Sequence, residues 1–147
     1  MGETLSYKFL LPVKQRQGVQ IGDVASHWVG FVVREGSVAL GTGEMAWVKG
    51  VLTFDVIKGG GPFSTYSTLI FQDSSRIIIH TKGISKEHSA SGPPEIKTTG
   101  EIIKGTGRFE GIKGTVSAWN KSMPLEKGEL GEKILGEATL TYTLPKK

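Results

Sequence analysis

The sequence contains no cysteine among its 147 residues. Disulfide bonds, thiolate nucleophiles and thiolate metal sites are therefore excluded. The first six residues, MGETLS, lack a basic segment that leads into an apolar one, so we expect no secretory signal peptide. Both features agree with a reducing compartment, and the location we expect is the cytoplasm.

Long apolar runs and helical periodicity are also missing. The longest apolar runs, residues 31–33 and 77–79, are far shorter than the roughly 20 residues of a membrane-spanning helix. The best helix-compatible stretch, 126–135, is interrupted by Gly128 and Gly131. Each glycine disfavours a helix interior by about 1 kcal/mol. The chain therefore predicts neither a membrane helix nor a helical domain.

Concentrated positive charge and metal-ligand spacing are absent as well. The net charge is +4, but the basic residues are spread along the chain and do not interleave with aromatic ones, so nucleic-acid binding is not expected. The three histidines, His27, His80 and His88, do not stand at the spacing of a metal site. No motif indicates a cofactor, and we expect none.

Glycine is abundant instead, with 21 residues scattered among β-branched and aromatic ones. This pattern is typical of many short strands separated by turns and bulges. Turns are expected at 34–37 and 72–75, Gly50 is expected to form a turn or a bulge, and polar loops are expected at 84–96, a candidate lid, and at 122–136. The expected strands are 5–11, 27–34, 38–40, 44–48, 51–57, 63–71, 76–82, 98–104, 114–121 and 137–144.

Closely spaced strands without crossover helices imply an antiparallel sheet, and closure into a barrel removes its exposed edges. We therefore predict an all-β fold with one domain over residues 1–147. The expected architecture is a single antiparallel up-and-down β-barrel of about eight strands. A barrel of this size is either filled by its own side chains or encloses one small ligand, and the strand pattern leaves both open.

A glycine-rich segment, residues 102–116, reads IIKGTGRFEGIKGTV. Phe109 can plug a barrel end from this turn. The segment resembles one in the allene oxide cyclase and dirigent barrels, which are calycin-like, and the strands 76–83 and 138–144 also look similar, so the resemblance spans roughly residues 64–144. Four glycines would permit positive φ and tight reversal there: Gly105, Gly107, Gly111 and Gly114.

The resemblance implies an isomerase or cyclase that acts, without a cofactor, on a mostly apolar, natural-product-like molecule in the barrel lumen. Holding the reacting atoms of the bound molecule near their attack geometry would supply much of the rate enhancement. It also implies a homodimer or homotrimer formed through the barrel exterior. The alternatives are a non-catalytic small-molecule-binding barrel, comparable to lipocalins or dirigent proteins, and a closed-core structural or interaction domain.

Three residues are candidate catalytic groups. Asp55 shares a strand face with Val51 and Ile57, and if that face lines the lumen its carboxyl could donate a proton or a hydrogen bond to a ligand carbonyl. If the face points outward, Asp55 is an ordinary surface carboxylate. Glu44 is a second carboxyl group that could donate in the same way. His80 is either an acid–base group or an exposed side chain without a catalytic role.

Six aromatic residues stand on six different expected strands. In a barrel some of them must point inward, where flat rings line ligand pockets well. The alternative is ordinary core filling or an oligomer interface. These candidate ligand-binding residues are Trp28, Trp47, Phe54, Tyr66, Trp119 and Tyr142.

Overall fold

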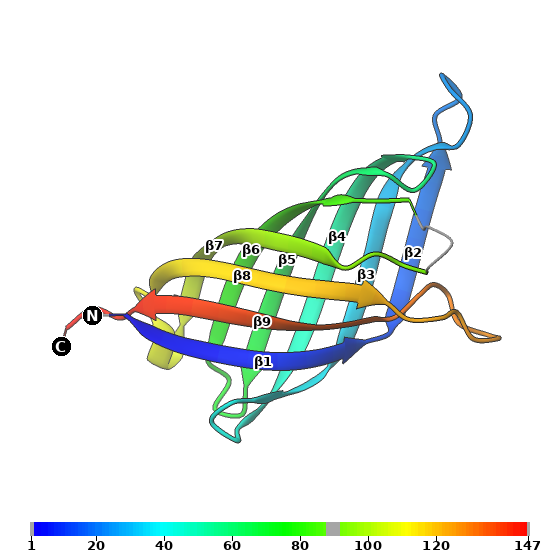
Figure 1. Ribbon diagram of the computed structural model, residues 1–147. Helices are drawn as coiled ribbons and strands as arrows, with labels where there is room; N and C mark the ends of the chain where they lie inside the picture. The colour runs from blue at the N-terminus through cyan, green and yellow to red at the C-terminus, as the bar shows by residue number, and fades with distance from the viewer. Residues whose placement is uncertain (1, 88–91, 147) are drawn as a thin grey trace.

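The computed structural model describes residues 2–87 and 92–146, and these ranges contain nine β-strands (Figure 1). A one-turn 3-10 helix, η1 (Gly107–Phe109), follows the seventh strand. No helix among the described residues has the length and apolar character needed to cross a membrane. The strands are β1 (Glu3–Leu11), β2 (Val13–Gln20), β3 (His27–Leu40), β4 (Met45–Ile57), β5 (Gly61–Phe71), β6 (Arg76–Ser85), β7 (Ile96–Thr106), β8 (Lys113–Ser122) and β9 (Ile134–Thr143).

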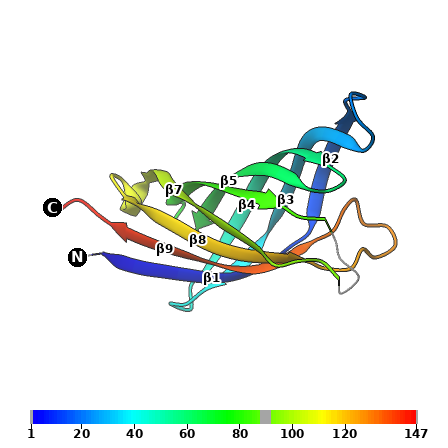
Figure 2. The same cartoon turned by 45° about the horizontal axis from the view of Figure 1, so that its top comes forward.

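All neighbouring strands pair antiparallel, in the order β1-β9-β8-β7-β6-β5-β4-β3-β2. A further pairing of β1 with β3, in which Tyr7 lies opposite Leu40, closes the sheet. Eight strands, β1 and β3 to β9, therefore form a closed up-and-down barrel, and β2 is one extra strand. Figure 2 shows β1, β8 and β9 along one wall and β3 to β5 behind them. The predicted fold class is confirmed.

Strands β1 and β2 both pair with the 14-residue strand β3, and β1 also pairs with β9. Tyr7 of β1 pairs with Leu40, and Val13 of β2 pairs with Arg34. Pro12 between them has no N–H to donate, so the ladder is interrupted there. β2 pairs with β3 alone and extends beyond the rest of the barrel wall (Figure 1). The sequence KQRQGV within β2 shows no apolar alternation, which is why the strand was not predicted.

Two expected interruptions are wrong. The segment 34–37 is not a turn, because β3 continues through it and pairs with β4 from Arg34 opposite Gly50 to Ala39 opposite Met45. Gly50 also remains within β4, opposite Ser67 of β5. The hairpin of 63–71 with 76–82 is confirmed within β5 and β6. His88 and the middle of the expected 84–96 loop lie outside the described residues.

One end of the barrel is closed by packed side chains. Phe109 from η1 is 6% exposed, and the centre of its ring lies 4.7 Å from that of Phe71. Phe109 therefore plugs this end, as its place in the glycine-rich segment indicates. We call this region the packed end. Its most deeply buried side chains are Val38, Val48, Leu69, Ile77 and Leu140.

The glycine-rich turn beside Phe109 uses its glycines for two different reasons. Gly107 and Gly111 adopt φ angles of 62° and 81°, which L residues rarely adopt. Gly105 and Gly114 do not take positive φ angles, so that expectation is wrong for them. A Cβ at Gly105 would lie 2.1 Å from the carbonyl oxygen of Phe109, so this glycine permits close backbone approach.

Candidate ligand-binding lumen

The lumen away from the packed end is hollow. A cavity of about 370 Å³ opens there, and inward-facing residues of all nine strands line it. Ligand pockets in proteins typically occupy about 300–1,000 Å³, so the cavity is large enough for one small molecule. The barrel is thus filled at one end and empty at the other.

Small side chains at inward positions explain the empty space. Gly50 lies opposite Ser67 on the lumen face, and Thr98 lies opposite Ala118. Side chains of this size leave the interior unfilled, whereas Leu69 and Leu140 belong to the buried cluster that fills the packed end. The same closed sheet therefore encloses a core at one end and a cavity at the other.

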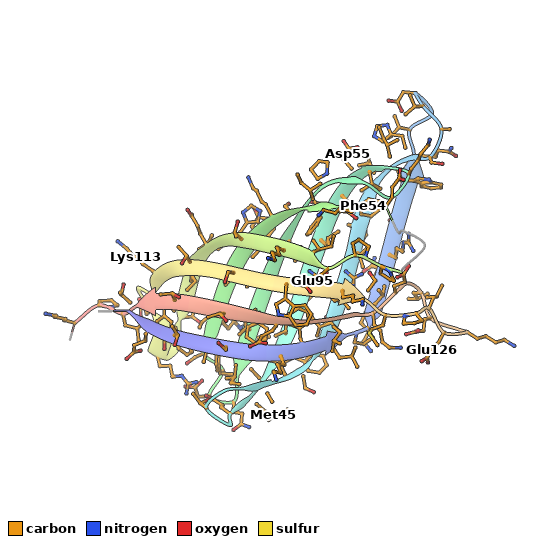
Figure 3. The ribbon with its side chains drawn as sticks, in the orientation of Figure 1. Met45, Phe54, Asp55, Glu95, Lys113 and Glu126 are labelled. Carbon is orange, nitrogen blue, oxygen red and sulfur yellow. The ribbon has the colours of Figure 1, made fainter. Side chains whose placement is uncertain are left out.

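Apolar side chains form most of the cavity wall. Phe54 of β4 lies opposite Phe63 of β5 in the sheet, and both rings line the cavity. Figure 3 labels Phe54, which lies on the inner side of the barrel. Such walls favour an apolar guest, because contact with them removes apolar surface from water. Further apolar lining residues are Phe9, Leu52, Val56, Ile79 and Val116.

Arg34 brings a charge into this apolar space. Its Nη2 donates a hydrogen bond to the main-chain carbonyl of Glu132 across 3.1 Å. Its Nε is buried, with no hydrogen-bond partner among the described residues. Burial, with the nearby charge of Arg16, lowers the pKa of Arg34 to about 10, against a smaller opposite effect of Glu132. The guanidinium therefore stays charged at neutral pH.

Tyr7 is a second polar residue of the cavity wall. It is 4% exposed and lines the lumen on β1. Burial raises the pKa of its phenol well above the ordinary value, so the group is uncharged at any pH near neutrality. A neutral phenol can donate a hydrogen bond to an oxygen of a bound molecule.

Asp55 lies on the outer face of β4, because Phe54 and Val56 occupy the inner positions on either side of it (Figure 3). The Asp55 side chain is 61% exposed, and its carboxylate accepts a hydrogen bond from Nε2 of His27 at 2.5 Å. Asp23 binds Nδ1 of the same ring at 2.6 Å. The condition under which Asp55 could act on a molecule in the lumen is therefore not met.

The other two catalytic candidates also lie outside the cavity. His80 of β6 stacks on Tyr66 of β5, with ring centres 4.2 Å apart and planes 11° from parallel. Glu44 lies beside the packed end, where its two carboxylate oxygens accept hydrogen bonds from Nη2 of Arg108 at 2.7 and 3.0 Å. The structure does not bring Asp55, His80 and Glu44 together.

Of the six aromatic candidates, only Phe54 lines the cavity. Trp28 is 41% exposed and lines a second, neighbouring hollow that Phe54 also lines. Trp47 and Tyr66 are 43% and 51% exposed and lie on the outer face. The other two, Trp119 and Tyr142, are half-buried outside the cavity lining, and Tyr142 packs against the core of the packed end.

Sequence reasoning missed the charged part of the lumen. Arg34 was placed at the end of the strand 27–34 and the start of a turn, and the face that it shares with Val32 at alternate positions was not considered. Because β2 was not expected, Arg16 was not recognised as a lumen residue either. Glu132 reaches the cavity from the loop before β9, and no local pattern in that loop predicts it.

The described residues contain no group of three or more His, Asp or Glu side chains able to hold a metal ion. No protein-family model and no curated protein matches the chain significantly. A solved structure that is similar belongs to a protein of unknown function from the DUF3224 family of Shewanella oneidensis MR-1. It has 12% sequence identity, a TM-score of 0.61 and coverage of 100% of both chains. At this identity the likeness shows the shared β-barrel fold alone.

Proposed function

We propose that this protein binds one small, mostly apolar molecule in the lumen of its barrel. The observation that carries the proposal is the cavity of about 370 Å³ with its largely apolar wall. A void of this size at the open end of a barrel is the usual location of a small-molecule site. Because Asp55, His80 and Glu44 all lie outside the cavity, binding without chemical conversion is the better-supported function.

A lumen-filling variant tests this function. Ala118 lines the cavity, so Ala118→Phe places a ring in it; Ala39→Phe, on the exposed face of β3, is the matched control. The neutral dye N-phenyl-1-naphthylamine, which fluoresces in apolar surroundings, serves as the probe. We expect saturable binding of one dye per chain, a loss of affinity of about tenfold or more in Ala118→Phe, and no change in Ala39→Phe. Equal affinity in both variants, or no saturable binding to the unaltered protein, would refute the proposal.

A second candidate is the isomerase or cyclase activity suggested by the resemblance to allene oxide cyclase and dirigent barrels, a calycin-like group. The observation that favours it is Tyr7, whose phenol is uncharged near neutral pH and which lines the largely apolar cavity. Such a donor could stabilise negative charge that develops on a ligand oxygen. An isomerisation changes the chromatographic retention of a bound molecule and leaves its mass unchanged. Conversion that persists in Tyr7→Phe would exclude this role of Tyr7.

We also propose a homodimer or homotrimer that forms through the outer face of the barrel. The exposed rings of Trp47 and Tyr66 on β4 and β5 support an interface there. Sedimentation equilibrium gives the mass directly, and Tyr66→Lys should shift it toward the monomer. A monomer at every concentration would contradict the assembly. A cytoplasmic location, which the lack of cysteine supports, remains part of the proposal.

A further inference from the structure

Arg34 is an unusual residue for a cavity that is otherwise largely apolar. It lines the lumen, it is charged, and the hydrogen bond found for its guanidinium goes to an uncharged main-chain carbonyl. Arg34 is half-buried and Glu132 offsets only part of its charge, so holding this ion partly out of water carries a desolvation cost. The fold therefore carries a cost here that a Leu or Met at this position would avoid.

The unused hydrogen-bonding capacity of the guanidinium indicates which chemistry would offset that cost. Nε of Arg34 is buried and has no partner among the described residues. Nη2 has two N–H groups, and one bond to Glu132 leaves the other for a ligand. A guanidinium N–H that faces the cavity can donate a charge-assisted hydrogen bond to a carboxylate oxygen.

The surrounding charge favours an anion as well. Arg16 of β2 also lines the cavity and is close enough to Arg34 to lower its pKa. Glu132 is the opposing charge, and its side chain neutralises only part of the two positive charges. Gly131, which precedes Glu132, packs against Arg16, so the loop before β9 lies over this charged region.

We infer that the molecule bound in the lumen is an amphipathic monocarboxylate. Its carboxylate pairs with Arg34, with Arg16 as the second positive charge, and its apolar chain lies against Phe9, Leu52 and Phe54. This inference rests on the proposed function, because it requires that the lumen accept a small molecule. It adds the chemical class of that molecule and the residue that selects it.

A matched pair of ligands tests the inference. Decanoate and decanol share one chain length and differ in the anionic head group, so their affinities by isothermal titration at about pH 7.5 isolate the contribution of the charge. We expect the unaltered protein to bind decanoate about tenfold or more tightly than decanol. In Arg34→Met, the affinity for decanoate should fall about tenfold or more, whereas the affinity for decanol should stay within about twofold of the original value.

The controls separate the two proposals. Arg76→Met removes an exposed arginine of β6 and should change neither affinity. Arg34→Lys keeps the positive charge but lacks the planar guanidinium, so it should retain part of the preference for decanoate over decanol. It is the second test variant if Arg34→Met does not fold. Equal binding of decanol and decanoate to the unaltered protein would refute the anion site and leave the lumen site in place. Failure of both ligands and of the neutral dye to bind would refute the lumen site itself.

Discussion

Arg34 and Glu132 are joined across 98 positions of the sequence by the hydrogen bond from the guanidinium to the main-chain carbonyl. This bond connects the lumen wall of β3 with the loop that precedes β9. Gly131 in that loop is buried, and a Cβ there would lie 3.2 Å from Val13. The loop therefore lies against the mouth of the cavity. Arg34 donates a hydrogen bond to this loop and also lines the cavity beneath it.

Arg34→Met separates a ligand-binding role of Arg34 from a structural one. Replacing a buried ion with an apolar side chain of similar size is often neutral or stabilising. We expect the free energy of unfolding, measured in urea, to remain within about 1 kcal/mol of the original or to rise. A loss of about 3 kcal/mol or more would show that Arg34 chiefly stabilises the fold and would count against its role in ligand selection.

Leu→Ala substitutions at the two ends of the barrel should lower the free energy of unfolding by different amounts. Leu69 at the packed end is 0% exposed, so Leu69→Ala should lower the free energy of unfolding by about 2–5 kcal/mol. Leu52 borders the cavity and has fewer atoms packed around it, so Leu52→Ala should cost about half as much or less. Urea denaturation of both variants measures the difference. Equal losses would show that the lumen around Leu52 is as well packed as the core.

The contact of His27 with two carboxylates predicts a pH dependence at the rim. Hydrogen bonds to Asp23 first, and then to Asp55, raise the pKa of His27 above its ordinary value of 6.5. The stabilisation is therefore fully present below pH 6.5 and is lost as the pH rises through the higher, folded pKa. The pKa of Asp23 is lowered from 3.8, chiefly by the bond to His27, so the contact also weakens as the pH falls through that lowered value.

Nuclear magnetic resonance checks this dependence. The titration of the His27 ring should give a pKa above 6.5, and Asp55→Asn should bring it down. The amide of Lys58, which donates to the carbonyl of Ser26, should exchange more slowly near pH 5.5 than near pH 8.5 after correction for the intrinsic rate. Asp73→Asn, in the turn between β5 and β6, is the control and should leave both readings unchanged. A His27 pKa at or below 6.5 would contradict the contact.

The sequence predicts the barrel well, because strand alternation and turn residues are local signals. It does not predict which face of a strand is inside. On β4, Val51 and Ile57 give the face of Asp55 two apolar residues, although Thr53 makes that face less apolar than the one with Leu52 and Phe54, so an inward Asp55 remained an open alternative. The decision comes from pairing with β3 and β5 across the whole closed sheet.

The charged part of the site was unpredictable for a related reason. β2 is a polar segment whose strand conformation depends on the edge that β3 offers, a non-local contact that its own residues do not indicate. Arg34 looks like a turn residue beside Glu35 and Gly36, although the strand continues through all three. Glu132 reaches the cavity only because its loop folds over the mouth.

Intermolecular nuclear Overhauser effects between unlabelled decanol and the labelled methyl groups of the protein test the central claim most directly. Val116 and Ile79 line the cavity, whereas Val51 and Ile78 lie on the outer face of their strands. The account predicts contacts from the alkyl chain to Val116 and Ile79, and none to Val51 or Ile78. Contacts confined to the outer methyl groups, with none to Val116 or Ile79, would contradict it.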